Sequence, residues 1–271
     1  MANDLFDLTG RVAVVTGGYG TLGASIAEGL ADAGASVALL GRNREAAEKK
    51  AEALRQAGAE AMALTADVLD SGQLAQARDE LLETWGRVDI LVNAAGGNVA
   101  RARTDTSPVF QMPLDAFDEV VRLNLYGTVN PTLIFGEAMA RQQKGSIVNI
   151  SSMAAMQAMS GVAGYSAAKA AIDNFTRWLA VDLARRNGEG LRVNAVAPGF
   201  FVADQNRNVL INSDGTYTER ARTILNRTPM GRFGDPAELQ GPVLWLCSDA
   251  ASFVTGTVIP VDGGFSAFSG V

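Results

Sequence analysis

Short runs of apolar residues recur along the chain, and most are followed by a longer segment with helical periodicity. The runs fall at residues 11–16, 35–40, 61–65, 89–93, 146–150, 191–196 and 257–261. Each has the length and the composition of a strand that is buried on both faces. Because helical segments separate these strands, the order predicts an α/β protein with a doubly wound parallel sheet of about seven strands flanked by helices.

The segments between the strands carry the predicted helices, at residues 21–33, 44–57, 71–85, 114–134 and 236–246 and in the stretch that begins near Tyr165. This last helix has an apolar stripe at helical spacing, for which we expect core or subunit packing; it comprises Phe175, Trp178, Leu179 and Leu183. No internal repeat or low-complexity linker divides the chain, so one domain is predicted for residues 1–271.

Two polar segments without a clear period follow strands. Residues 97–113 carry Asn98, Arg101, Arg103 and Asp105, and residues 200–228 carry Asp204, Gln205, Asn206, Arg207, Arg220 and Arg222. Long aperiodic segments in compact domains are often functional. In a parallel sheet both would leave the carboxyl ends of strands, where ligands bind. We therefore predict that both segments cover a substrate.

A glycine cluster directly follows the first strand and reads Gly17-Gly18-Tyr19-Gly20-Thr21-Leu22-Gly23. Glycines in this position let the backbone turn tightly and approach a pyrophosphate, while the N-terminus of the next helix faces its negative charge. Strand, glycine turn and helix in this order therefore predict a dinucleotide-binding site.

The residues after the second strand favour NADP(H) over NAD(H). An NAD-preferring site usually places a carboxylate here, roughly 20 residues after the glycines, to bind the ribose 2′-hydroxyl. This chain has Gly41-Arg42-Asn43 instead. The Arg42 guanidinium can pair with a 2′-phosphate, and no carboxylate repels it. The alternative is that Arg42 is a solvated residue at a helix start, and NAD(H) remains possible.

Candidate acid–base chemistry centres on Tyr165 and Lys169. Residues four apart lie on one helical face, so the Lys169 ammonium is expected beside the Tyr165 phenol. A nearby positive charge lowers a tyrosine pKa and makes the group usable near neutral pH. Ser152 ends the preceding strand, at the edge where active-site groups of open α/β sheets collect.

Composition narrows the possible chemistry and partners. The net charge of −6 argues against nucleic acid or an anionic membrane as partner. The chain has no histidine and one cysteine, Cys247, so no metal site is predicted. Cys247 forms no intrachain disulfide, the opening MANDLFDLTG is acidic, and no apolar run reaches the length of a membrane span. We therefore expect a cytoplasmic protein without membrane partners.

Taken together, these residues resemble the short-chain dehydrogenase/reductase family along the whole chain. The matching residues, in the family's order, are Thr16–Gly23, Asp67, Asn93-Ala94-Ala95-Gly96, Asn124, Ser152 thirteen positions before Tyr165, Lys169 and Pro198-Gly199. The resemblance implies a single-domain Rossmann fold, a nicotinamide cofactor and a Ser152–Tyr165–Lys169 site in which Asn124 holds a proton-relaying water. It also suggests a homotetramer.

The predicted cofactor-binding residues are Gly17, Tyr19, Gly20, Thr21, Leu22, Gly23, Arg42, Asn43, Asp67, Val68, Asn93, Ala94, Ala95, Tyr165, Lys169, Pro198 and Gly199. Within this set the resemblance assigns Lys169 to the nicotinamide ribose. Two positions depart from the family pattern. Thr21 stands where a glycine is usual, and Ala203 stands where many members have a threonine that holds the nicotinamide amide.

Within the family the chain looks most like enzymes of sugar acids, those that interconvert D-mannonate and D-fructuronate. The similar blocks include Ala95-Gly96-Gly97-Asn98 and Gln205-Asn206-Arg207. This likeness implies a reversible NAD(P)(H)-dependent oxidoreductase of a polar carbonyl or hydroxy substrate. Asn98 and Arg207 are the candidate substrate residues, Arg207 for the carboxylate, unless Arg207 pairs with Asp204. Alternatives are a reductase of a 3-oxoacyl chain or small ketone, and a non-catalytic NADP-binding protein.

Overall fold

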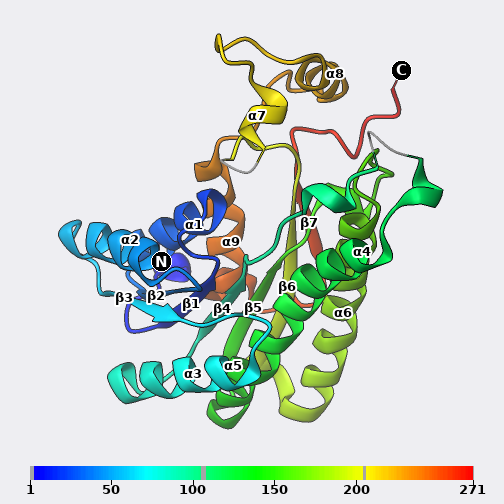
Figure 1. The fold of residues 1–271 in the computed structure, drawn as a ribbon. Helices are drawn as coiled ribbons and strands as arrows, with labels where there is room; N and C mark the ends of the chain where they lie inside the picture. The colour runs from blue at the N-terminus through cyan, green and yellow to red at the C-terminus, as the bar shows by residue number, and fades with distance from the viewer. Residues whose placement is uncertain (1–2, 105–107, 204–205, 271) are drawn as a thin grey trace.

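The computed structural model describes residues 3–104, 108–203 and 206–270, built around one parallel sheet with the strand order β3-β2-β1-β4-β5-β6-β7 (Figure 1). The strands are β1 (Val12–Thr16), β2 (Ser36–Gly41), β3 (Ala61–Thr65), β4 (Ile90–Asn93), β5 (Gly145–Ile150), β6 (Leu191–Pro198) and β7 (Val258–Val261). The predicted doubly wound sheet of about seven strands is therefore confirmed. Asp105, Asp204 and Gln205 lie outside the described residues.

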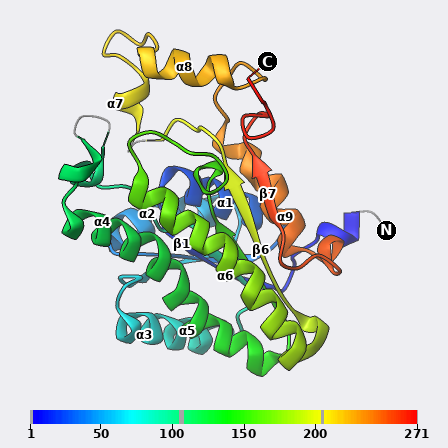
Figure 2. The same ribbon diagram turned by 90° about the vertical axis from the view of Figure 1, so that its right-hand side faces the viewer.

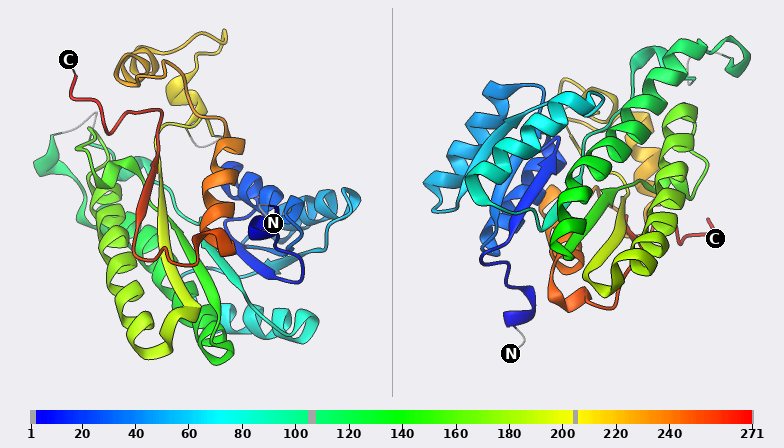
Figure 3. Two further views of the ribbon diagram at one scale, coloured as in Figure 1. Left: turned by 180° about the vertical axis from the view of Figure 1, so that it is seen from behind. Right: turned by 90° about the horizontal axis from the view of Figure 1, so that it is seen from below.

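Helices cover both faces of the sheet (Figures 2 and 3). One face packs against α1 (Thr21–Asp32), α2 (Arg44–Gln56) and α9 (Gln240–Cys247). The other packs against α3 (Ser71–Trp85), α5 (Gly127–Gln142) and α6 (Ala163–Asn187). Alternate residues of β1 enter the two cores, Ala13 and Val15 on the first face and Val12 and Val14 on the second. This two-sided burial explains the continuous apolar runs in the sequence.

The helix predicted at 114–134 differs in the structure. It consists of α4 (Leu114–Val121), a π-helical turn (Arg122–Tyr126) and α5, which continues to Gln142. A π turn inserts one residue into the helical repeat and is common at functional sites. Apolar periodicity does not reveal such an insertion, because the residues on either side keep their helical spacing.

The segment 200–228 contains two helices that the sequence did not predict, α7 (Arg207–Leu210) and α8 (Glu219–Arg227). They stand beyond the carboxyl edge of the sheet, as Figures 1 and 2 show. Leu210, Ala221 and Ile224 form a small buried core of their own there. α8 begins after Thr218, whose side chain accepts a hydrogen bond from the Ala221 amide, which is a normal helix N-cap.

In the described part of the chain, none of the helices combines the length and the apolar character that crossing a membrane requires.

Candidate active site

The carboxyl ends of β1 and β4 form the topological switch point of the sheet, because the chain leaves β1 toward β2 and leaves β4 toward β5. In open α/β sheets, ligands bind in the crevice at such a point. The Thr16 hydroxyl holds the two strand ends together, accepting hydrogen bonds of 3.1 Å from the amides of Ala94 and Ala95. The glycine turn and the Asn93–Gly96 segment therefore face one another.

The backbone of the glycine turn requires glycine at Gly17 and Gly23. Gly17 has φ +64°, a conformation that favours glycine. A Cβ at Gly23 would lie 2.3 Å from the Gly17 carbonyl oxygen. Gly20 is the N-cap of α1 and provides no side-chain hydrogen bond. The first amides of α1 consequently have no side-chain N-cap, as a phosphate-binding helix start requires.

A cavity of about 320 Å³ lies over this turn. Among its lining residues are eleven of the predicted cofactor residues: Gly17, Tyr19, Gly20, Thr21, Leu22, Gly23, Arg42, Asp67, Val68, Ala94 and Ala95. Sequence reasoning missed Gly41, Ala66, Gly96 and Leu123 as lining residues, and Ala203 lines the cavity at the position noted as a departure. The glycine cradle, the uncapped helix start and the single cavity across the switch point fit a nicotinamide dinucleotide.

Six predicted cofactor residues are not among the residues that line this cavity: Asn43, Asn93, Tyr165, Lys169, Pro198 and Gly199. Asn43 caps α2, accepting a hydrogen bond of 3.0 Å from the Ala46 amide. The Asn93 side chain points into the core, where it donates to Thr132 and Asn149 at 2.8 Å each. Strand alternation explains this, since Asn93 belongs to β4 and its side chain faces α5.

Arg42 lies at the rim of the cavity. Its side chain is 71% exposed, and its guanidinium lies 3.9 Å from the Asp67 carboxylate. Such an exposed and distant pair contributes little to stability. The Arg42 guanidinium is therefore available to a ligand in this cavity.

The predicted catalytic residues Ser152, Tyr165 and Lys169 come together beside the cofactor cavity. Ser152 follows β5 and is buried, and Tyr165 lies in the first turn of α6, packed near Ala102, Ala116 and Val120. The Lys169 ammonium is buried, donates to the Ile150 carbonyl at 2.7 Å and lies 5.5 Å from the centre of the Tyr165 ring. The helical spacing therefore brings the ammonium close to the phenol, as expected.

The predicted lowering of the Tyr165 pKa is wrong for this structure. Burial raises the pKa of the phenol, and only hydrogen bonding with Ser152 opposes the rise. The same burial lowers the pKa of Lys169 to about 8, opposed by the Asp173 carboxylate. Desolvation disfavours both the Tyr165 phenolate and the Lys169 ammonium. The proximity of Lys169 therefore did not determine the direction of the Tyr165 pKa shift.

Asp173 was not singled out from the sequence, but it lies one turn beyond Lys169 on α6 and is buried. Its carboxylate accepts a hydrogen bond from the Ser151 hydroxyl. Burial raises the Asp173 pKa, while Ser151, Arg177 and Lys169 lower it. Tyr165, Lys169 and Asp173 therefore form one polar face of α6 at intervals of four residues.

Replacing Asp173 with asparagine is expected to lower the Lys169 pKa below about 8, because the carboxylate is the charge that stabilises the ammonium. If catalysis needs the ammonium, the alkaline limb of kcat/KM then moves to lower pH. pH profiles of the wild type and the variant measure this. Asp182→Asn, at the solvent side of α6, is the matched control. An unmoved limb in Asp173→Asn would mean that Asp173 only supports packing.

The folded-state pKa of Lys169 also determines how this residue affects the pH dependence of folding stability. It lies below the ordinary value of 10.5, so between about 8 and 10.5 the unfolded chain binds more protons than the folded chain. The contribution of Lys169 to stability therefore rises with pH across this window.

Asn124 sits in the π turn and is completely buried. Its side-chain amide donates to the carbonyls of Gly97 and Val120 at 2.7 and 2.8 Å, and its side-chain oxygen accepts from the Gly97 amide at 3.1 Å. A Cβ at Gly96 would lie 2.7 Å from the same oxygen and 3.6 Å from the Lys169 ammonium. Asn124 therefore fixes the Gly96–Gly97 backbone between the cofactor cavity and Lys169.

A second cavity of about 470 Å³ adjoins the first, since Gly96 lines one and Gly97 the other. Its lining residues come from both predicted substrate segments and from the catalytic group: Gly97, Asn98, Val99, Ala100, Arg103, Ser152, Met153, Met159, Gly161, Val162, Tyr165, Gly199, Phe200, Asn206, Val209, Leu210, Arg220 and Ile224. Asn98 therefore lines the same cavity as Ser152 and Tyr165. Pro198 is buried at the end of β6 and lines neither cavity.

The structure does not place Arg207 among the residues that line the second cavity. Arg207 begins α7 and is exposed. Its neighbour Asn206 faces inward instead, with its side chain bound to the Ala203 amide and the Phe201 carbonyl at 2.8 Å each. The arginines that do line the cavity are Arg103 and Arg220.

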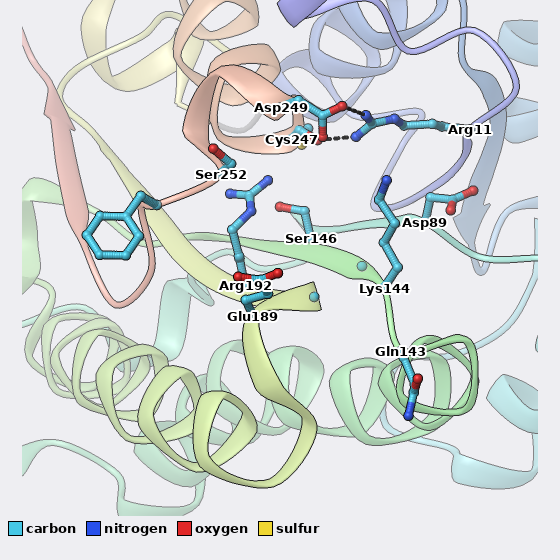
Figure 4. A pocket seen from close by; sticks show the side chains of 13 residues that line it. Arg11, Asp89, Gln143, Lys144, Ser146, Glu189, Arg192, Cys247, Asp249 and Ser252 are labelled. Carbon is cyan, nitrogen blue, oxygen red and sulfur yellow. Dashed lines mark hydrogen bonds and ion pairs between the residues drawn. The ribbon is translucent and has the colours of Figure 1, made fainter.

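A third cavity, of about 370 Å³, lies at the opposite, amino-terminal edge of the sheet (Figure 4). Two of its arginines are bound to groups of the protein itself. Arg11 pairs with Asp249 at 2.6 Å, and Arg192 donates to the carbonyls of Leu246 and Ser248. Within the described residues, no group of three or more histidine, cysteine or acidic side chains is arranged to hold a metal ion.

Comparison with known proteins agrees with this geometry. Residues 16–266 match the family described as enoyl-(acyl carrier protein) reductase. The chain is 44% identical to the uncharacterized oxidoreductase UxuB of Bacillus subtilis (strain 168), with 98% of each chain covered. The chain belongs to the short-chain dehydrogenase/reductase family and is an NAD(P)-dependent oxidoreductase by this membership.

Two solved structures show the likeness in three dimensions. A protein of Haemophilus influenzae, provisionally assigned as a D-mannonate oxidoreductase and solved with bound NAD, superimposes with a TM-score of 0.93 at 40% identity and 100% coverage of both chains. A gluconate 5-dehydrogenase of Burkholderia cenocepacia J2315, in complex with NADP and tartrate, gives a TM-score of 0.89 at 34% identity, covering 99% of this chain and 100% of the other.

Proposed function

We propose that this protein interconverts a secondary alcohol and a ketone in a sugar acid, with D-mannonate and D-fructuronate as the substrate pair. The observation that carries the proposal is the cavity beside Tyr165 and Ser152. Among the described residues, its only charged lining groups are the arginines 103 and 220. An anionic substrate is attracted to such a cavity, and the sugar-acid relatives support the same class.

The proposed mechanism divides the reaction between cofactor and protein. The nicotinamide, when bound, supplies or accepts the hydride. In the reducing direction, Tyr165 donates its proton to the developing alkoxide, and the Ser152 hydroxyl hydrogen-bonds the same oxygen. Lys169 would hold the nicotinamide ribose, and its ammonium lies near the phenol. Asn124 would hold the water that relays protons between Lys169 and solvent.

A raised Tyr165 pKa suits this role, because the phenol then keeps its proton throughout the neutral range. Lys169 has a pKa of about 8 and can exchange a proton near neutral pH. The pair therefore provides a proton donor in contact with substrate and a group behind it that can restore the proton.

A second candidate function is the reduction of a 3-oxoacyl chain. It is favoured by the apolar part of the cavity lining, which includes Met153, Met159, Phe200, Leu210 and Ile224, and by the description of the matching family. Assays that follow the absorbance of reduced nicotinamide with D-fructuronate, 5-ketogluconate and an acetoacetyl thioester would separate the candidates. Preference for the thioester would reject the sugar-acid proposal.

We also propose that NADPH is preferred over NADH, because Arg42 at the cavity rim can pair with the 2′-phosphate. Replacing Arg42 with aspartate is expected to reverse the preference, since a charge-assisted hydrogen bond worth about 1.5–3 kcal/mol is lost and repulsion is added. Fluorescence titration with both cofactors measures this. Arg44→Asp, two residues later and outside the cavity, should change neither affinity. Tighter NADH binding by the wild type would refute the role of Arg42.

A homotetramer in the cytoplasm is the proposed state of the protein. Its support is the exposure of large apolar side chains on the π turn, α5 and α6, where Tyr126, Leu133, Trp178 and Val181 are more than half exposed. Scattered apolar residues are normal on a surface, but neighbouring ones mark contact sites. Sedimentation equilibrium that finds a monomer would refute the assembly, and cell fractionation tests the location.

A further inference from the structure

We propose that Arg220 binds the carboxylate of the substrate, an inference that rests on the proposed sugar-acid function. Arg220 lines the same cavity as Ser152 and Tyr165, although it lies 55 residues beyond Tyr165 in the chain. It is half-buried, in contrast to the exposed Arg207. Arg220 therefore borders the cavity that contains the reacting groups.

The backbone that carries Arg220 is firmly placed. It is the second residue of α8, directly after the Thr218 N-cap and Glu219. The next residue, Ala221, is completely buried, and Ile224 one turn later packs in the same small core as Leu210. A binding group on such an anchored helix start loses little entropy when it engages a ligand.

Arg220 has no anionic partner within the described parts of the chain. Several other arginines of the protein are paired, for example Arg55 with Glu48 and Glu52, and Arg232 with Glu238. The nearest acid in sequence, Glu219, is exposed and lines a neighbouring groove together with Arg220, but it does not line the catalytic cavity. A half-buried guanidinium without a carboxylate gains more from an incoming anion than a paired one does.

The charged groups that line the cavity favour a carboxylate as the ligand of Arg220. A guanidinium forms two parallel hydrogen bonds with a planar carboxylate, which fixes both position and orientation. Arg103, from the segment at the other side of the cavity, adds positive charge, and no acidic side chain is among the described lining residues. Holding one end of a sugar acid in this way would present its ketone to Tyr165.

The test compares D-fructuronate with D-fructose, which has a hydroxymethyl group in place of the carboxylate. Arg220→Gln is expected to reduce kcat/KM for D-fructuronate by roughly 10- to 150-fold, the range that loss of a charged hydrogen bond gives, and to leave D-fructose unaffected. Arg220→Lys should recover part of the loss, because it restores charge without the planar fork. Arg222→Gln, two residues later on α8, exposed and lining neither cavity, is the matched control and should leave kcat/KM for both sugars unchanged.

Unchanged NADPH affinity and melting temperature in Arg220→Gln would show that the variant is folded. Equal losses on both sugars, or no loss on D-fructuronate, would overturn the role of Arg220 while the wild-type activity still supports the proposed function. A wild type that reduces a neutral ketone better than D-fructuronate would instead reject the proposed function and the inference with it.

Discussion

Replacing Tyr165 with phenylalanine is expected to lower kcat by about 10²- to 10⁴-fold, the usual cost of losing one acid–base group. Tyr165 lines the substrate cavity together with Ser152, and the chain has no histidine to replace it as proton donor. Its ring packs near Ala102, Ala116 and Val120, contacts that phenylalanine keeps. The loss should therefore appear in kcat, with NADPH affinity and melting temperature unchanged.

Tyr126→Phe is the matched control for this substitution. Tyr126 lies on the π turn, is 52% exposed and lines neither cavity. The same chemical change there should leave kcat unaltered. Steady-state kinetics of both variants on D-fructuronate measure the difference, and a Tyr165→Phe enzyme that retains most of its activity would rule out the proposed proton donor.

Replacing Gly23 with alanine is expected to disrupt the cofactor site and the start of α1. The added Cβ would lie 2.3 Å from the Gly17 carbonyl oxygen and 3.2 Å from the Gly18 Cα, which are backbone atoms that cannot rotate away. Overpacking of this kind costs about 1–3 kcal/mol. If the glycine turn changes its shape to avoid the clash, NADPH affinity falls by roughly 5- to 150-fold. If the turn keeps its shape and the folded state is strained instead, the melting temperature falls by several degrees.

Gly241→Ala provides the control, because Gly241 is also in a helix but a Cβ there would meet no atom within 4 Å. Alanine should stabilise that position by about 0.5–1 kcal/mol. Titration with NADPH and thermal unfolding of both variants measure the contrast. A Gly23→Ala protein with normal cofactor affinity and normal stability would show that the turn can open without loss.

The sequence alone was sufficient to predict the strands of the sheet and most of the residues that line the cavity over the glycine turn. Buried parallel strands need continuous apolar runs, and the glycine turn needs residues without Cβ atoms. Both features can therefore be recognised from short segments of the sequence. The i, i+4 spacing likewise predicted the approach of Lys169 to Tyr165. The sequence did not predict the direction of the Tyr165 pKa shift, because that depends on burial by segments distant in the chain.

The substrate side was harder to predict. Arg207 and Arg220 lie in the same polar segment, and no periodicity in it indicates which one faces the cavity. The Thr218 cap and the spacing of Ala221 and Ile224 were readable signals for α8, and with α8 placed, Arg220 would have become a candidate. The π turn at Asn124 left no such signal.

The proposed function is tested most directly by the reduction of D-fructuronate by the purified wild-type protein with NADPH. The product is identified by chromatography. We expect NADPH oxidation and D-mannonate formation in equal amounts, at a kcat/KM above that for D-fructose and an acetoacetyl thioester. Absence of D-mannonate, while another carbonyl compound is reduced efficiently, would contradict the sugar-acid function.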